Sequence, residues 1–596
     1  VIISMRGGGT APGGGGSKEM DIWEAARSCV VKKAIDGVPG MKALLLDDVT
    51  SKIVSLVCSQ SEALSMQVYA VDKLDNPLRK PIGGFRGVCF IRSTPETIRV
   101  LCRELSDPKF ESYHLFFTNS LPDHLLKDIA QADKKQVVQQ VHEIFVDYFP
   151  LNSEVCTLDV PSCMPLEQDS WNQPLFDRIS DGIVSILLSL KLNPVIAFQK
   201  NSEIAQKLAS EIDDRVRTGN HTSDVDLFRF GKTSKQPPLL LIVDRREDPV
   251  TPLLNQWTYT AMIHETLGIH NNRVDMSNVP KCEQEEVVLS THDDDFFSKA
   301  EHMEFGELGE SLQNVLVALQ KDEGSAVAAG GGRSNLQSIG DIQRFMDRYP
   351  EFRKQQSTVA KHVALTSELS RAVDDRMLLE LSELEQELAV TDSLTEAFNR
   401  VETMVENQSI RHEDKVRLVL LYVLRYELEG ERESRFLERS LRDQLPADSP
   451  LLRAVALLKS YAGVNVRSSD IFNKKSVANV AKTMVKRHFV EGIKGVSNVL
   501  TRHEPLLASR LGGLKASGVS SLRQEEFKVL GANAAVKPQH IVVFVVGGAT
   551  YAEAKCVSAF NKDNAARGMR AVLASNCIHN TSSFLQDVLS YEPKNS

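Results

Sequence analysis

The sequence predicts two α/β domains with parallel sheets and a large, mainly helical domain inserted into the second of them. Over residues 18–150, short strands alternate with helices, which is the pattern of a parallel sheet with crossover helices. Two later apolar runs, Leu239–Val243 and Ile541–Val546, are short and end in turn residues, so both are expected to be buried strands. The chain between Glu265 and Lys486 has a helical pattern, which makes the second α/β domain discontinuous.

The first α/β domain is expected to start with a helix after Asp21, because apolar residues recur there on one helical face. These residues are Ile22, Trp23, Ala26 and Val30. Strands are predicted at Met41–Leu46, Val68–Val71, Gly87–Ile91, Tyr113–Thr118 and Glu143–Asp147. Helices are predicted between several of them, such as Pro95–Leu105 and Pro122–Ala132.

The second α/β domain is expected to begin near Leu151. Its first helix has an apolar face of Leu175, Ile179, Ile183, Ile186, Leu187 and Leu190. A strand, a polar helix and a second strand follow at Val195–Phe198, Ser202–Arg217 and Leu239–Val243. After the insertion, two strand–helix pairs are predicted at Ile541–Val546, Thr550–Asn564, Met569–Ala574 and Ser583–Leu589. This last segment is too short to form a domain alone, so we expect it to complete the sheet begun before the insertion.

Helices dominate the inserted domain. Phe305–Lys321 and Ile339–Leu369 are predicted helices, and Gly330–Gly332 between them predicts a mobile loop. Val416–Leu428 is apolar on almost every side, so it is expected to be the central helix of an α bundle.

Composition limits the classes of function. Of the 596 residues, 42% are hydrophobic and 25% are charged, values that are ordinary for a soluble globular protein. The net charge of −9 and the lack of a long basic block argue against nucleic-acid binding. The nine cysteines are scattered without a CxxC pair, which predicts a reduced, cytosolic protein without disulfides or a zinc site. No apolar run is long enough to cross a bilayer, and Gly7–Ser17 is expected to be a flexible tail.

A dense charged turn, Asp244–Asp248, follows the strand Leu239–Val243, and Pro249 and Pro252 stiffen its exit. Ligands of open α/β sheets bind at the carboxyl ends of strands, so an active site is one interpretation of this turn. The other interpretation is that its acids and arginines pair with one another and fix how the chain leaves the sheet. Structural ion-pair networks are common, which favours the second interpretation.

Motifs for catalysis are missing from the sequence. The stretch 541–553 has a strand, a Gly-Gly turn and a helix start, but it lacks the GxGxxG spacing and the lysine of phosphate-binding loops. The His-Glu pair at 264–265 is followed by a histidine two residues too late for the HExxH zinc motif, and no GxSxG motif occurs. Asp244 and Asp248 are therefore the only catalytic candidates, and no base, metal cage or cofactor loop accompanies them.

Several long blocks of this sequence resemble the Sec/Munc (SM) family of proteins, which bind SNAREs and guide membrane fusion. The central block is LLLIVDRREDPVTPLLNQWTYTAMIHE (239–265), and GMKALLLDDVTSKIVSLVCSQSE (40–62) fits as well. Further blocks are ESYHLFFTNSL (111–121), VRLVLLYVLRYE (416–427), GVSNVLTRHEPLL (495–507) and VVFVVGGATYAEA (542–554). The resemblance covers essentially the whole chain after residue 20. DRREDPVTPLLNQWTY together with GMKALLLDD is most similar to the endosomal and trans-Golgi branch of the family.

The resemblance implies an arch of three domains, no catalysis and no cofactor. The expected division is a disordered tail at 1–20, domain 1 at 21–150, domain 2 at 151–247 and 486–596, domain 3a at 248–360 and domain 3b at 361–485. The glycine tail before Asp21 and a glycine-rich insert at 324–332 depart from the family pattern, at the start of the chain and at the tip of the helical hairpin.

The resemblance also implies partners. A syntaxin-type Q-SNARE is expected to bind through its N-terminal peptide and its helical core, and an R-SNARE and the assembled SNARE complex are expected as further partners. The protein is expected to be a cytoplasmic monomer, to reach endosomal, trans-Golgi and vesicle membranes indirectly through its SNARE, and not to bind nucleic acid.

Three sets of residues follow from the resemblance. The groove for the syntaxin N-peptide is expected to use Phe116, Phe117, Leu125 and Ile129, and the alternative is that all four are core residues. The hairpin of domain 3a is expected to present a SNARE-facing stripe, unless its members pack inside the domain. The stripe consists of Leu308, Leu312, Val315, Leu316 and Leu319. The junction of domains 2 and 3a is expected to be braced by Asp244, Arg245 and Asp248.

Two hypotheses of function remain. In the first, the protein is a SNARE chaperone: the N-peptide raises the effective concentration of the SNARE at the arch, and the hairpin templates the pairing of SNARE helices. In the second, it is an α/β metal-dependent hydrolase or phosphotransferase that uses Asp244 and Asp248 with a bound metal. Replacing both aspartates by asparagine would stop turnover in an enzyme that stays folded, whereas a scaffold would lose stability or domain orientation.

Overall fold

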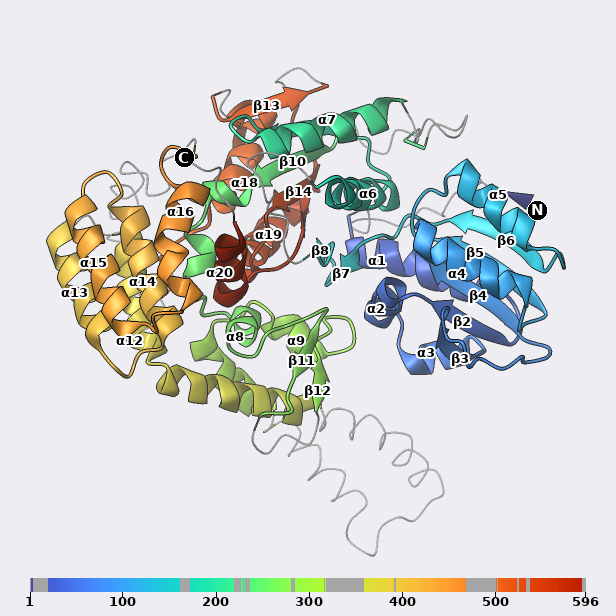
Figure 1. Ribbon diagram of the computed structural model, residues 1–596, viewed down its shortest axis with the longest axis horizontal. Coiled ribbons are helices and arrows are strands. Elements are labelled where there is room, and N and C mark those ends of the chain that lie inside the picture. Colours follow the sequence, from blue (N-terminus) through green and yellow to red (C-terminus); the bar gives the residue numbers. More distant parts are fainter. Residues whose placement is uncertain are drawn as a thin grey trace, which may run out of the picture.

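A computed structural model of the chain contains two parallel sheets and a helical bundle. The described residues are 2–3, 20–160, 172–218, 227–228, 230, 236–279, 285–315, 317, 358–390, 393–467, 500, 502–522, 525–531 and 536–591. In Figure 1 the first α/β domain (blue) lies on one side, the helical domain (yellow and orange) on the other, and the second α/β domain between them. The predicted fold class is therefore observed: two parallel-sheet α/β domains, with a helical domain inserted into the second.

The first sheet is parallel throughout and has the strand order β1-β6-β5-β4-β2-β3. Its strands are β1 (Ile2–Ile3), β2 (Lys42–Leu46), β3 (Val68–Lys73), β4 (Arg86–Ile91), β5 (Ser112–Phe117) and β6 (Val138–Glu143). The inner strand β2 is buried along its whole length, whereas its neighbour at the edge, β3, exposes every second residue. Its helices are α1 (Ile22–Arg27), continued by the π-helix Ser28–Ile35, α2 (Asp48–Val57), α3 (Gln60–Ser65), α4 (Pro95–Ser106) and α5 (Asp123–Ala132).

The second sheet has the strand order β13-β9-β10-β14-β15-β8-β7. Its strands are β7 (Phe149–Pro150), β8 (Val155–Thr157), β9 (Val195–Gln199), β10 (Leu239–Asp244), β13 (Phe527–Leu530), β14 (His540–Val546) and β15 (Arg570–Ser575). The two outer strands, β13 and β7, are antiparallel to their neighbours and the others are parallel. Strand β10 pairs with β14 from Leu239↔Ile541 to Asp244↔Val546, so the segments before and after the helical domain share one sheet.

Helices cover both faces of this second sheet. They are α6 (Gln173–Ser189), α7 (Glu203–Thr218), α18 (Leu506–Ser517), α19 (Tyr551–Asn564) and α20 (Thr581–Ser590). Leu240 and Ile242 of β10 belong to the same hydrophobic cluster as α6 and α7, whereas Leu241 and Val243 pack in the cluster of α18 and α19. Because both faces of β10 are covered, its sequence is a continuous apolar run.

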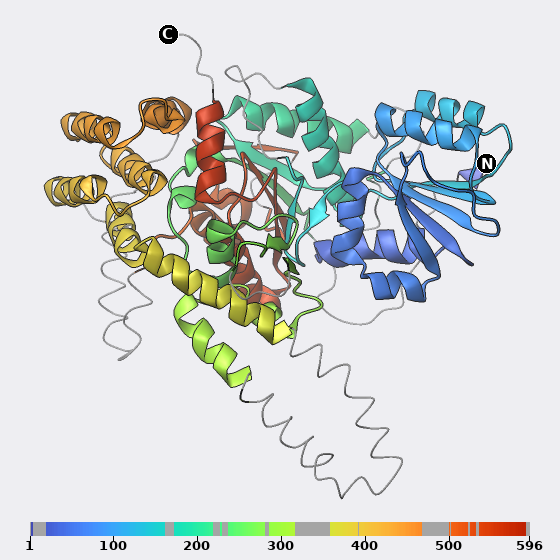
Figure 2. The same ribbon diagram turned by 60° about the horizontal axis from the view of Figure 1, so that its bottom comes forward.

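The helical domain begins after β10 and contains α8 (Tyr259–Thr266), α9 (Asp295–Ala300), α12 (Leu378–Val390), α13 (Leu394–Glu406), α14 (His412–Arg425), α15 (Glu431–Gln444) and α16 (Ala454–Ala462). A small antiparallel pair, β11 (Arg273–Asp275) and β12 (Glu286–Val288), belongs to it. Every residue from Asp414 to Leu424 is buried, which confirms that α14 is the central helix. In Figure 2 the helices at 305–315 (light green) and 358–375 (yellow) lie on the lower side of this domain.

Several predicted elements differ in the structure. The strand predicted at Glu143–Asp147 is wrong, because β6 ends at Glu143 and Phe145 has a positive φ of 50°, which no regular strand allows. Burial of Ile144 and Val146 without strand geometry explains the error. In the predicted tail, Ile2–Ile3 pair with β6, since the edge of a sheet offers unpaired backbone groups.

Some predictions are met only in part or lie outside the described residues. The predicted helices Phe305–Lys321 and Ile339–Leu369 are seen as helical turns at 305–315 and 358–375, and Gly330–Gly332 lies outside the described residues. Strands β7, β8 and β13 were not predicted, because two to four residues are too few to show a period. Within the described part of the chain, no helix is both long and apolar enough to cross a membrane.

A buried ion cluster ties α14 to its neighbours. The Arg417 guanidinium lies 2.7 Å from a carboxylate oxygen of Glu385 in α12 and 3.0 Å from one of Asp414. Glu385 also accepts a hydrogen bond of 2.9 Å from the backbone of Asn255, which follows β10. The side chains of Arg417 and Glu385 are 0% exposed, so each charge depends on the other for its compensation.

The first α/β domain shares one hydrophobic core with the second, and the chain passes from one to the other through a segment that we call the strap, residues 151–159. The Asn152 amide donates to a carboxylate oxygen of Glu301, just after α9, over 2.6 Å. The pKa of Glu301 is raised to about 7, chiefly by burial and also by Glu154, although the bond from Asn152 and the charge of Lys562 lower it. The folded protein therefore binds a proton at Glu301 more tightly than the unfolded chain does.

Replacing Arg417 by Met should leave Glu385 buried without the counter-charge that lies 2.7 Å from it, whereas Asp414 keeps Arg376 at 2.9 Å. We expect the free energy of unfolding of the helical domain to fall by about 3–5 kcal/mol, measured by urea denaturation with circular dichroism. Arg435→Met is the matched control, because Arg435 pairs with Glu431 on the surface with 68% of its side chain exposed. That control should lower the free energy of unfolding by less than about 1 kcal/mol. Equal losses in the two variants would show that the buried ion cluster has no special role in stability.

Glu301 should make stability depend on pH near neutrality. A raised folded-state pKa gives stability that is fully present below the ordinary value of 4.5 and is lost as the pH rises through about 7. We expect Glu301→Gln to keep the neutral hydrogen bond and to remove a loss of about 2.5 kcal/mol between pH 5 and pH 8.5. Melting temperatures of wild type, Glu301→Gln and the surface control Glu111→Gln at both pH values test this. A wild-type profile unchanged by Glu301→Gln would refute it.

Candidate functional site

The charged turn after β10 is buried rather than open to solvent. Asp244, Arg245 and Asp248 are 6%, 2% and 5% exposed. Asp244 accepts hydrogen bonds from the Ser202 hydroxyl (2.6 Å), the Arg246 backbone (2.9 Å) and the Arg246 guanidinium (2.7 Å). Its carboxylate is thus fully engaged inside the turn and at the start of α7.

Arg245 links the turn to the C-terminal segment of the second α/β domain. Its Nε donates to the Gly548 carbonyl over 3.1 Å, its Nη1 to the Asp248 carbonyl over 3.0 Å, and its Nη2 to the Glu553 carboxylate of α19. Asp248 in turn accepts from the Thr251 hydroxyl (2.7 Å) and the Leu506 backbone (3.1 Å). These bonds join β10, α18 and α19, which are far apart in the sequence.

The pKa values of the two aspartates do not suit proton transfer. Burial alone would raise the pKa of both carboxyl groups, but Arg246 lowers that of Asp244 and Arg245 lowers that of Asp248, and both pKa values lie below the ordinary one. A general acid or base at neutral pH needs a pKa shifted toward 7. Among the described residues, no group of three or more His, Cys, Asp or Glu side chains is arranged to hold a metal ion.

The Gly547–Gly548 turn after β14 uses its backbone amides within the protein. The Gly547 amide donates to the Asn576 side chain over 3.1 Å, and the Ala549 amide donates to the Cys577 carbonyl over 2.9 Å. Both glycines have positive φ, and a Cβ on Gly548 would overlap the His579 ring, so glycine is required here by the turn. These contacts support the interpretation of a strand-to-helix turn rather than a phosphate loop.

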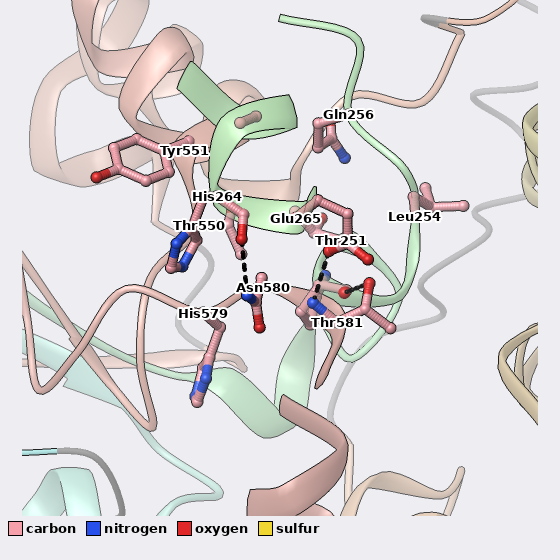
Figure 3. A pocket seen from close by; sticks show the side chains of 12 residues that line it. Thr251, Leu254, Gln256, His264, Glu265, Thr550, Tyr551, His579, Asn580 and Thr581 are labelled. Carbon is pink, nitrogen blue, oxygen red and sulfur yellow. Dashed lines mark hydrogen bonds between the residues drawn. The ribbon is translucent and has the colours of Figure 1, made fainter. Parts of the chain in front are cut away.

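A small cavity of about 20 Å³, the size of one water molecule, lies where α8 meets the start of α20. Figure 3 shows His264 and Glu265 of α8 facing Asn580 and Thr581. The Asn580 amide donates to the His264 carbonyl over 2.8 Å, and the Thr581 amide donates to the Glu265 carboxylate over 3.0 Å. The His264 ring accepts from the Ile269 amide, so it caps the end of α8 and is not arranged as a zinc ligand.

The four residues expected in a peptide groove are buried in the first α/β domain. Phe116, Phe117, Leu125 and Ile129 are 2%, 0%, 5% and 2% exposed. Phe117 packs with α5 on one face of the sheet, while Phe116 stacks on the His142 ring on the other, with 5.3 Å between ring centroids. Their part in a groove stays a prediction, and a peptide on this face would touch the partly exposed neighbours above them.

Those neighbours are Leu126 and Val137, which the sequence analysis missed. Both pack against the cluster of Phe117, Leu125 and Ile129 while remaining partly exposed. Leu126 follows Leu125 directly in α5, so it points about 100° away around the helix axis. Helical periodicity in the sequence identifies the residues that face the core. It does not identify partly exposed residues such as Leu126 at the border of the core.

The hairpin stripe is described only at its base. Leu308 and Leu312 are 0% and 5% exposed and belong to the core of the helical domain, and Val315 packs against that core while partly exposed. Leu316 and Leu319 lie outside the described residues. At Leu308 and Leu312 the side chains therefore face inward, and a SNARE-facing role for the stripe stays a prediction.

An exposed apolar surface that the sequence analysis missed lies at the free edge of the first sheet. We call it the β3 patch: Met41, Leu64, Tyr69 and Val71, which are 46%, 56%, 54% and 62% exposed. Lys42 pairs with Val68 and Ala43 with Ala70, so Tyr69 is the extra residue of a β-bulge, and its ring contacts Phe85. Exposed apolar groups on an unpaired edge indicate a contact surface, because edges are otherwise protected.

Comparison with known proteins gives one consistent result. The model of the Sec1 family matches residues 42–587. Vacuolar protein sorting-associated protein 45 of Homo sapiens is 37% identical over 573 residues, covering 96% of this chain and 96% of the relative. The Dictyostelium discoideum protein of the same name is 38% identical over 584 residues, covering 97% of this chain and 98% of the relative.

Solved structures agree with the sequence comparison. The SM protein Vps45 in complex with the Qa SNARE Tlg2 (1–310) has a TM-score of 0.83 and 37% identity, covering 96% of this chain and 98% of that one. Unc18 in its syntaxin 1 complex from Monosiga brevicollis, at 21% identity and a TM-score of 0.74, supports the fold alone. The chain, whose family match runs from β2 to α20, therefore belongs to the Sec1 family of SM proteins.

Proposed function

We propose that this protein is a SNARE-binding regulator of vesicle docking and membrane fusion in endosomal, trans-Golgi and vacuolar traffic. The observation that carries the proposal is the likeness, over 96% of the chain, to Vps45 in complex with the Qa SNARE Tlg2. The partner is then a syntaxin-type Qa SNARE, bound through its N-terminal peptide and helical core, with an R-SNARE and the assembled complex as further partners. The protein acts as a cytoplasmic monomer that reaches membranes through its SNARE.

The proposed division of labour follows the expected domains. Domain 1 (21–150) binds the SNARE, domain 2 (151–247 and 486–596) is the platform, and domain 3 (3a, 248–360; 3b, 361–485) carries the hairpin. Pairing of β10 with β14 supports a platform made of two segments. The bonds of Arg245 and Asp248 support a brace at the point where domain 3a leaves the platform.

The mechanism is binding without catalysis. The alternative hydrolase or phosphotransferase needs Asp244 and Asp248 to reach a metal and a substrate, but both carboxylates are buried and hydrogen-bonded within the turn. No observation favours that alternative.

The β3 patch is the proposed contact for the helical core of the SNARE. An amphipathic helix binds by placing its apolar face on exposed apolar side chains, and four half-exposed ones are found on β3 and on the segments beside it. On the other face of domain 1, Leu126 and Val137 form the proposed rim for the N-peptide, above Phe117, Leu125 and Ile129. Two separate contacts let a weak peptide anchor raise the effective concentration of the helical core.

Charges placed in the β3 patch should weaken binding of the SNARE core. Tyr69→Glu with Val71→Glu should raise the Kd of the Qa SNARE cytosolic region about 10-fold or more, because each charge would be desolvated against an apolar helix face. Isothermal titration calorimetry measures this, with Leu428→Glu, at a 78% exposed site in the helical domain, as control. Unchanged affinity in the patch variant would remove the patch from the site. No binding of any Qa SNARE by the wild type would contradict the proposed function.

A charge at the rim of the predicted groove should act on the peptide alone. Leu126→Arg should reduce the affinity for the isolated N-peptide about 10-fold while the melting temperature stays within a few degrees, since Leu126 is partly exposed. Phe117→Arg should instead unfold domain 1, because Phe117 is 0% exposed. Lys127→Ala, on the exposed side of the same helix, is the control. Full peptide binding by folded Leu126→Arg would place the peptide elsewhere.

A further inference from the structure

A stacked ring pair joins the first α/β domain directly to the helical domain. Trp23 of α1 and His292, in the loop between β12 and α9, have ring centroids 3.5 Å apart and ring planes 15° from parallel. The indole is held in place because its Nε1 donates to the Leu56 carbonyl over 2.9 Å and the Arg27 guanidinium lies 5.5 Å above the ring centroid. His292, in contrast, belongs to an exposed loop.

Burial of the His292 ring favours its neutral form, against the effect of most of the charges around it. Burial of the ring lowers its pKa below the ordinary 6.5, while Asp21 and Glu24 of α1 and the adjacent Asp293 raise it and Arg27 lowers it. A neutral imidazole stacks on an indole as an aromatic pair, which is a contact of modest strength. Such a contact can break and reform without unfolding either domain.

The strap, residues 151–159, provides the other connection between the same two domains. On its domain 1 side, the Ser153 hydroxyl donates to the Asp21 carboxylate over 3.0 Å, and Lys52 lies 3.2 Å from Asp159. On its helical side, the Asn272 amide donates to the Leu151 carbonyl over 2.7 Å. Asn271 also donates to Asp159, over 3.2 Å, so Asp159 is shared between the two sides.

The strap also borders empty space. A cavity of about 430 Å³ lies at the meeting point of the three domains, with Lys52, Asp159, Asn271 and Ile578 among its lining residues. This space is partly open to solvent, so the side chains of the three domains that line it are not packed against one another there. The strap itself is fixed to the second sheet, because its residues Val155–Thr157 form β8 and pair with β15.

We propose that the Trp23–His292 stack is a latch that holds domain 1 against the helical domain. The latch closes the side of the arch on which the SNARE core is proposed to bind. This link between the latch and SNARE binding rests on the proposed function. Loss of the stack raises the open-to-closed ratio, and with it the apparent affinity for any ligand that needs the open form.

The free protein tests the latch without any SNARE. Donor and acceptor dyes are coupled through unnatural amino acids at exposed Lys73 of β3 and Lys299 of α9, and single-molecule energy transfer gives the open and closed populations. His292→Ala should raise the open-to-closed ratio about 2- to 12-fold, the range expected for one aromatic pair. His292→Phe keeps a ring on Trp23 and should restore the wild-type ratio. His412→Ala, an exposed histidine of α14, should change nothing.

The energy-transfer results are interpreted only for variants whose melting temperatures show that they are folded. An unchanged ratio in His292→Ala, or a failure of His292→Phe to restore it, overturns the latch. In a second arm, His292→Ala should lower the Kd of the Qa SNARE cytosolic region by the same factor and leave the N-peptide Kd unchanged. If His292→Ala changes the open-to-closed ratio but leaves the Kd of the Qa SNARE cytosolic region unchanged, the latch does not control SNARE binding. A wild type that binds no SNARE overturns the proposed function, and the free-protein ratios still decide the latch.

Discussion

The arrangement of the domains depends on one buried cation, the guanidinium of Arg245. Its side chain is 1% exposed, and it donates to the Asp248 carbonyl, the Gly548 carbonyl and the Glu553 carboxylate. A buried charge is tolerated only when its partners are in place, so the chain leaving β10 and the chain entering α19 must hold a fixed geometry. The helical domain departs from the sheet at this turn, so these three bonds contribute to its orientation.

The two junctions of the molecule differ in physical character. Between the second α/β domain and the helical domain, the contacts are buried ion pairs and hydrogen bonds from several elements, such as Arg245 with Glu553 and Asn580 with His264. Between the first α/β domain and the helical domain, the described contacts are a ring stack on a loop and bonds that pass through the strap. The first kind of junction is rigid, whereas the second permits motion at low cost. A SNARE-binding arch needs both, because one side must hold its shape while the other admits a long helix.

Sequence patterns predicted elements better than they predicted exposure. Strands such as β10 and β14 were identified because burial on both faces leaves a continuous apolar run, and α14 because it is apolar on every side. The pairing of β8 with β15 and of β13 with β9 has no such signal, since short strands carry no period. At the candidate site, the resemblance pointed to β5 and α5 of the first domain, and the apolar residues that it named there proved to be buried, as Phe117 and Leu125 show. The exposed rim depends on helix rotation and on a bulge, which no single-sequence pattern records.

The burial of the predicted groove residues and the exposure of the β3 patch have a common cause. Apolar residues in the middle of a sheet or on the inner face of a helix must be covered for the domain to fold. They therefore cannot also form the surface that a binding partner contacts. Tyr69 escapes this constraint because the bulge removes it from the pairing with β2, and Val71 because β3 has a neighbour on one side only. An uncovered edge invites unwanted pairing, and the charged end of β3, where Lys73 pairs with Asp48, limits that risk. A surface that is apolar, unpaired and bounded by charge is what a regulated contact with an amphipathic helix requires, and it is found where the regular pairing of the sheet is broken.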